Sequence, residues 1–150
     1  MHTKTQQPES EFYKKYRGSF TSVLKWPQLD EFWQNVKAKA HEEWYIYQIG
    51  ESLPETYVTP EQLTKFVDEI DPLIRKEHQE EYCGIVYADN LSEPTFIKIY
   101  DPNNLGVVCG FSDNPPLPGW VLSQLKPESL DENTFSTQSR KRWWRRLFSV

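Results

Sequence analysis

Hydrophobic residues recur at spacings of three and four in two stretches of the chain, which is the period of an amphipathic helix. In residues 27–40 the apolar positions are Leu29, Phe32, Trp33, Val36 and Ala40. In residues 60–74 they are Leu63, Phe66, Val67, Ile70, Leu73 and Ile74. Each stretch is predicted to be a helix that buries one face, with charged residues on the other.

The sequence Thr59-Pro60-Glu61-Gln62 marks where the second helix begins. Thr59 can accept a hydrogen bond from the first free backbone N–H groups, and Gln62 can reach back to complete a capping box. Proline is favoured at the first helical position because it has no N–H to leave unpaired. Further along, Asp71-Pro72 interrupts the pattern, which predicts a kink or two abutting helices.

Strands are predicted where aromatic and β-branched residues cluster between turn residues. Residues 44–49 form one such cluster, and residues 82–88 and 95–100 flank the turn-forming segment 89–94 as an antiparallel hairpin. Residues 107–111 follow a second turn, 101–106, and are the fourth predicted strand. Residues 120–125 return to the core as a last short element. The pattern predicts an α+β fold, in which a small, mostly antiparallel sheet of about four strands has helices packed on one face.

The 150 residues are enough for one core, and the composition divides them into four parts. Residues 1–20 are polar, have no clear period and are predicted to be a flexible arm. Residues 21–126 form the single α+β domain. Residues 127–139 are polar and acidic, which is typical of a flexible linker, and residues 140–150 form a cationic aromatic tail.

Charge is distributed unevenly along the chain. The net charge is -5 and the tail carries five basic residues, so residues 1–139 have a net charge of -10. The N-terminal residues lack the apolar run of a secretory signal, and no stretch is apolar enough to span a membrane. Two cysteines are too few for a disulfide framework. We therefore expect a cytoplasmic protein, and the basic tail leaves peripheral attachment to a membrane open as an alternative.

The tail has the composition of a binding segment. On a helical wheel its aromatic and aliphatic side chains lie on one side and most basic side chains on the other, with Arg140 as the exception. The predicted binding residues are Arg142, Trp143, Trp144, Arg145, Arg146, Leu147 and Phe148. Trp and Arg are frequent at interface hot spots, which favours a partner protein. Docking of the tail on the acidic body and attachment to an anionic membrane remain open, and nucleic acid fits least because the protein is acidic.

A thiol-dependent enzyme or redox protein is the competing class. It would use Cys109 or Cys83, with Asp101 or His78 as a possible partner. Free cysteines are usually small buried hydrophobes, and this favours a packing role for both thiols. His41 and His78 each precede carboxylates, but neither segment has the spacing of a metal site. No catalytic residue, metal or cofactor is therefore predicted.

Together these patterns favour a non-enzymatic accessory or adaptor protein. It would bind a partner protein through an aromatic surface, through the tail, or through both. If the tail lies outside the core, deleting residues 139–150 should change the free energy of unfolding by no more than about 0.5 kcal/mol.

Overall fold

The computed structural model describes residues 9–103, 117–130 and 138–148, and these ranges hold a five-stranded antiparallel sheet. Its strands are β1 (Thr21–Val23), β2 (Tyr45–Gln48), β3 (Val86–Ala88), β4 (Phe96–Ile99) and β5 (Trp120–Ser123). Their order across the sheet is β1-β3-β4-β5-β2. The predicted α+β class with a small antiparallel sheet is confirmed, as is the predicted hairpin, which forms β3 and β4.

Two of the strands differ from the prediction. β1 was not predicted, because its three residues are too few to show an alternating pattern. β5, predicted only as a short element, lies between β4 and β2, and all four of its residues are buried. The strand predicted at residues 107–111 lies outside the described residues.

Successive residues of each strand point to opposite faces of the sheet. Ile46, Ile97 and Leu122 are cross-strand neighbours and belong to the main core, whereas Tyr47, Phe96 and Val121 belong to a second, smaller cluster. The sheet therefore has two apolar faces. This explains why its strands are rich in large apolar residues rather than alternating with charged ones.

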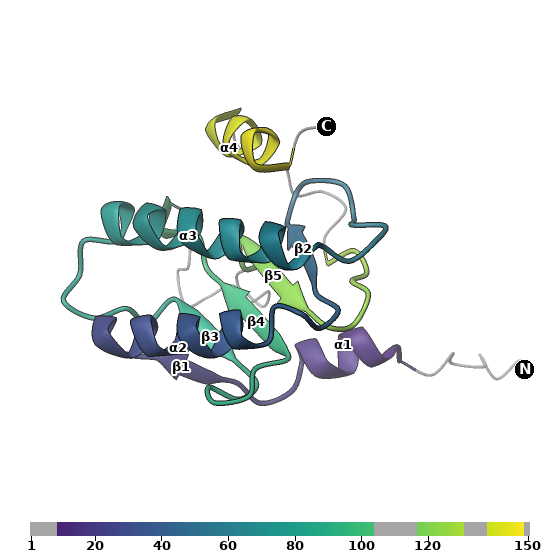
Figure 1. The fold of residues 1–150 in the computed structure, drawn as a ribbon, viewed down its shortest axis with the longest axis horizontal. Helices are drawn as coiled ribbons and strands as arrows, with labels where there is room; N and C mark the ends of the chain where they lie inside the picture. The colour runs from purple at the N-terminus through teal and green to yellow at the C-terminus, as the bar shows by residue number, and fades with distance from the viewer. Residues whose placement is uncertain (1–8, 104–116, 131–137, 149–150) are drawn as a thin grey trace, which may run out of the picture.

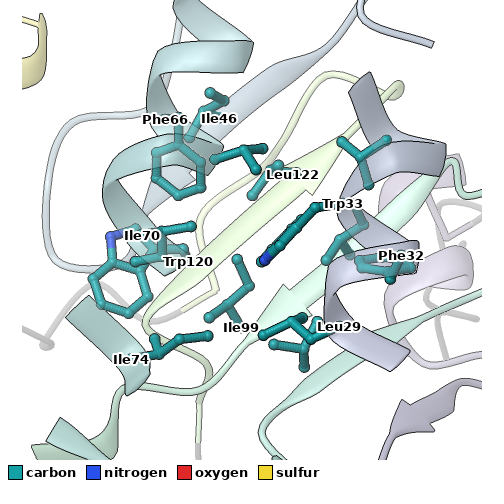
Figure 2. Close-up of a cluster of buried hydrophobic side chains, with 14 of the residues drawn as sticks. Leu29, Phe32, Trp33, Ile46, Phe66, Ile70, Ile74, Ile99, Trp120 and Leu122 are labelled. Carbon is teal, nitrogen blue, oxygen red and sulfur yellow. The ribbon is translucent and has the colours of Figure 1, made fainter. Parts of the chain in front are cut away.

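The larger core lies between the sheet and two helices, α2 (Trp26–Ala38) and α3 (Pro60–Glu77). Figure 2 shows how their side chains meet those of the sheet. The buried residues of the two helices are those that the sequence periodicity predicts: Leu29, Phe32, Trp33 and Val36 from α2, and Leu63, Phe66, Val67, Ile70 and Ile74 from α3. This confirms the two predicted helices.

The N-terminus of α3 has the predicted capping box. The backbone N–H of Gln62 donates to the Thr59 hydroxyl at 3.1 Å, and the Thr59 N–H donates to the Gln62 side-chain oxygen at 2.8 Å. The helix then runs through Pro72, which is exposed, as one element to Glu77. The interruption expected at Pro72 does not divide it into two helices.

The opposite face of the sheet is covered in part by α1 (Glu11–Tyr16), within the segment predicted to be a flexible arm. That prediction is wrong for these residues. Phe12 is buried and packs against Phe96 with 5.3 Å between the ring centroids. The Tyr13 hydroxyl donates to the carbonyl of Ser129 at 2.5 Å, so the first residues of the predicted linker also contact the body. The signal was missed because a helix of six residues is too short to show a period.

The C-terminal residues form a fourth helix in the described part of the chain, α4 (Gln138–Phe148). Figure 1 shows α4 lying along α3, on the side away from α2. Residues 138 and 139 are thus helical rather than part of a linker, while 131–137 lie outside the described residues. This position of α4 makes the tail part of the folded body.

Candidate functional site

Arg140 attaches α4 to the body through two carboxylates. Its Nε and Nη2 donate to Asp101 at 2.7 and 2.9 Å, and its Nη2 and Nη1 donate to Glu77 at 2.8 and 3.2 Å. The Arg140 side chain is 8% exposed and that of Asp101 is 10% exposed. The buried Arg140–Asp101 pair is bidentate, and this geometry fixes the orientation of both side chains.

The ends of two elements position the carboxylates. Asp101 follows β4, and its side chain accepts a hydrogen bond from the backbone N–H of Asn103 at 2.9 Å, which closes a tight turn. Gly119 lies so close that an added Cβ would be 3.0 Å from the Asp101 Cβ, so a larger residue here would push against Asp101. Glu77 is the last residue of α3, where the helix dipole also favours a cation.

The electrostatics of this site hold Arg140 in its charged form. The hydrogen bonds that the Arg140 guanidinium donates to Asp101 raise its pKa; burial opposes this effect, and the hydrogen bonds donated to Glu77 add to it. Because the net direction is upward, the charge persists across the physiological range. Asp101 and Glu77 are the counter-charges that hold Arg140, and with it α4, against the body.

Trp143 and Leu147 provide the apolar part of the contact and are 8% and 7% exposed. The Trp143 ring lies 5.6 Å from that of Trp120 and 6.0 Å from that of Phe66, both at steep angles typical of edge-to-face packing. The Gln48 side chain links Trp120 to α4. It accepts a hydrogen bond from Trp120 Nε1 at 2.9 Å and donates one to the backbone carbonyl of Arg140. One side of α4 is thus integrated into the main core.

The other side of α4 faces solvent. Arg142, Arg145 and Arg146 are exposed, and the only ion pair found for them within the described residues is a long one, 3.8 Å from Arg146 to Glu69. Trp144 and Phe148 are half-buried at the margin and lie 4.4 Å apart. Three arginines and an aromatic pair therefore form an exposed surface on a fixed helix, which we call the arginine face.

Docking of the tail on the body, one of the alternatives left open by the sequence, is what the structure shows. Arg140, the exception on the helical wheel, lies on the docked side together with Trp143 and Leu147. The sequence did contain a signal for this docking. A charge in the middle of an apolar stripe needs a buried partner of opposite charge, and Arg140 has that position on the helical wheel. The premise that the tail lies outside the core is wrong, so the small effect expected from its deletion no longer follows.

The residues proposed for thiol chemistry do not come together. Cys83 is fully buried and burial raises the pKa of its thiol, although backbone hydrogen bonds from Ile85 and Val86 oppose this. Asp101 is occupied by Arg140. His78 lies between the rings of Trp26 and Tyr82. Cys109 lies outside the described residues.

The described residues hold no group of metal-ligating side chains, and the hollows described here lie along α3. In the described part of the chain no three His, Cys, Asp or Glu side chains could hold a metal ion. Two hollows lie along α3, an open one of about 550 Å³ and one of about 200 Å³ between α2 and α3. The open one is lined by Pro60, Glu61, Thr64, Lys65, Asp68 and Glu69. Neither has a cysteine or a histidine in its lining.

A second group of exposed apolar and aromatic residues lies where the segment before α2 meets the segment after α3. Leu24 is 58% exposed and Tyr82 is 56% exposed, and the Cys83 N–H donates to the Leu24 carbonyl, which brings the two segments together. Trp26 and His78 complete this group.

Comparisons with protein families, with curated protein sequences and with solved structures find no match to this chain. None of the helices in residues 9–103, 117–130 and 138–148 has the length and apolar content needed to cross a membrane.

Proposed function

We propose that this protein is a non-enzymatic accessory protein that binds an acidic segment of a partner protein through the arginine face of α4. The observation that carries the proposal is the two-sided helix: Arg140, Trp143 and Leu147 fix it to the body, while three arginines remain exposed beside Trp144 and Phe148. A helix that is already ordered loses little conformational entropy on binding.

A protein partner is favoured over a membrane by the position of the aromatic residues. An interfacial helix inserts its apolar face among the lipid chains, but here Trp143 and Leu147 are buried in the body. Insertion would require undocking and would expose Trp120 and Phe66. A carboxylate-rich protein surface can bind the arginines with α4 in place, and an apolar side chain can cover Trp144 and Phe148.

Nucleic acid is disfavoured by the remaining charge. Without the five basic residues of the tail the chain has a net charge of -10, and repulsion between this body and phosphates opposes close approach. A short acidic segment of a protein can contact α4 without approaching the rest of the acidic body.

Charge reversal on the arginine face tests the proposal. Arg142→Glu, Arg145→Glu and Arg146→Glu together should weaken capture of the partner from the source cell by roughly tenfold or more, since three charge-assisted contacts are lost. Capture is measured by quantitative mass spectrometry against the wild-type chain. Raising the salt concentration should weaken capture by the wild-type chain, because the contacts are exposed.

The matched control reverses three exposed lysines elsewhere, Lys14, Lys76 and Lys126. Both variants change the net charge by the same amount, so an equal loss in the two would attribute binding to net charge alone and contradict the proposal. Purified protein is also titrated with phosphatidylserine vesicles and with a single-stranded oligonucleotide. Binding to either that is tight and depends on the three arginines would replace the protein partner with that ligand.

A further inference from the structure

Arginine is concentrated at the C-terminal end of the chain. Residues 1–137 contain ten lysines and two arginines, whereas residues 138–150 contain four arginines and one lysine. The two residue types carry the same charge at neutral pH, so a need for positive charge does not by itself favour arginine. They differ in shape, because the guanidinium is a planar fork of five N–H donors and the ammonium is a compact charge.

The other arginines of the described chain all bind carboxylates. Arg75 donates from Nε to both carboxylate oxygens of Asp71, at 2.9 and 3.0 Å, and from Nη2 to Asp30 at 2.7 Å. Arg140 is bound by two carboxylates in the same manner, and Arg17 pairs with a glutamate. In the body of this protein, therefore, each arginine fork is matched to the oxygens of an anion.

The arginine face lacks such an anion. Among the described residues no ion pair is found for Arg142 or Arg145, and Arg146 has only its long contact to Glu69. Arg142 lies three and four residues before the other two, so it neighbours both on the helix surface, where like charges repel one another. Lysine would interact equally well with the dipole at this end of α4, so the dipole does not explain three forks.

We propose that the arginine face recognises a phosphorylated segment of its partner, with the phosphate of a phosphoserine or phosphothreonine held by Arg142, Arg145 and Arg146. This inference rests on the proposed function and specifies the anion. A carboxylate has two oxygens in one plane and a single charge, which suits one fork. A phosphate monoester has three oxygens and a charge of about -1.5 to -2 at neutral pH, so it can accept hydrogen bonds from several forks and offset their repulsion.

The aromatic pair favours a peptide as the carrier of the phosphate. Trp144 and Phe148 lie at the margin of α4, where they are half-buried and pack against the main core. A phosphorylated side chain is short, so an apolar neighbour in the same peptide can reach this pair. The membrane surface and nucleic acids also carry phosphates, but both present many charges at once, and the net charge of -10 on residues 1–139 opposes their approach.

The test uses the immobilised full-length protein and three libraries of short synthetic peptides. The central position is fixed as phosphoserine, glutamate or serine, and the flanking positions are mixed, so that no single peptide sequence has to be assumed. The phosphoserine library should be retained at least roughly tenfold more than the glutamate library, because the dianion accepts more charge-assisted hydrogen bonds. Retained phosphopeptides should be enriched in apolar residues near the phosphoserine.

A charge-conserving variant separates the fork from the charge. Arg142→Lys, Arg145→Lys and Arg146→Lys together should lower retention of the phosphoserine library by roughly tenfold, since a bidentate contact is lost. Retention of the glutamate library should stay within about twofold, because the net charge is unchanged. The matched control replaces the exposed Lys14, Lys76 and Lys126 by arginine and should keep the wild-type preference. Circular dichroism verifies that each variant is folded.

The possible failures of this inference are distinguishable from a failure of the proposed function. Equal retention of the phosphoserine and glutamate libraries, or a preference that the lysine variant keeps, overturns the phosphate assignment. Retention of no library also overturns it. Tighter binding to vesicles that contain phosphatidylinositol bisphosphate than to the phosphopeptides would assign the arginines to a lipid headgroup instead. In each case, capture with the charge-reversed variant still decides separately whether an acidic partner binds this face.

Discussion

At the scale of single residues, Thr59 and Lys98 show how a side chain gains or loses energy from its surroundings. The hydroxyl of Thr59 satisfies a backbone N–H that has no partner within the helix. Lys98 has the opposite role, because its charge is placed where water is partly excluded and no carboxylate is bound to it in the described structure. Each leads to a measurable effect on stability.

Thr59→Ala should lower the free energy of unfolding by about 0.5–2 kcal/mol, because the Gln62 N–H loses its acceptor. Urea denaturation measures the difference. Thr56→Ala, at an exposed position three residues earlier, is the control and should change stability by less than about 0.5 kcal/mol. Equal midpoints for Thr59→Ala and the wild-type chain would show that the cap does not stabilise α3.

The lowered pKa of Lys98 predicts that the free energy of unfolding depends on pH. Its pKa is about 8 in the folded chain and 10.5 as an ordinary lysine, so between these values the unfolded chain binds more protons than the folded one. Stability due to this group therefore rises with pH through that interval, by about 1–2 kcal/mol from pH 7 to pH 9.5. Above pH 10 the raised pKa values of Tyr16 and Tyr100 act in the opposite direction.

The measurement is the difference in free energy of unfolding between the wild-type chain and Lys98→Met at the two pH values. Methionine keeps much of the side-chain volume and removes the titrating group. The free energy of unfolding of the wild-type chain should increase relative to that of Lys98→Met as the pH rises. A difference that is the same at both values would contradict a lowered pKa.

At the scale of elements, α4 combines an apolar contact with a buried ion pair. Trp143 and Leu147 cover Trp120 and Phe66, and Arg140 neutralises Asp101 and Glu77. Removing one partner of such a pair costs more than the pair itself contributes, because a charge is left behind without compensation. The helix is thus a structural element as well as the carrier of the arginine face.

Deleting residues 139–150 should lower the free energy of unfolding by about 2–4 kcal/mol, since two buried side chains are lost and the Asp101 carboxylate loses its partner. The entropy recovered by the deleted helix offsets part of this cost. Urea denaturation of the truncated and full-length chains measures it, with Arg145→Ala as a control expected within about 0.5 kcal/mol. A truncated chain as stable as the intact one would show that α4 does not dock in solution.

At the scale of the whole molecule, the fold separates surfaces of different character. Figure 1 shows α2, α3 and α4 arranged one beside the next, and α1 apart from them near the end of the sheet. The arginine face lies on α4, beside an α3 that carries acidic residues such as Glu61, Asp68 and Glu69. Lys98 and the rings of Tyr16 and Phe20 lie on the other face of the sheet.

The sequence alone determined those features that depend on neighbouring residues. The three-four spacing gave α2 and α3 and their buried faces, the Thr59 capping box gave the start of α3, and turn residues gave the hairpin of β3 and β4. These signals are strong because their physical cause, helical or strand period and the pairing of backbone groups, operates within a few residues. The α+β class follows from them.

Only the tertiary structure decided how the tail and the short elements are used. Arg140 pairs with residues 39 and 63 positions away, and no local pattern encodes which buried carboxylate a distant arginine will meet. The same is true of Phe12 in α1 and of Lys98, whose surroundings come from α1 and neighbouring strands. The physical reason is that burial and charge pairing are properties of assembled surfaces, which arise only when segments far apart in the chain pack together.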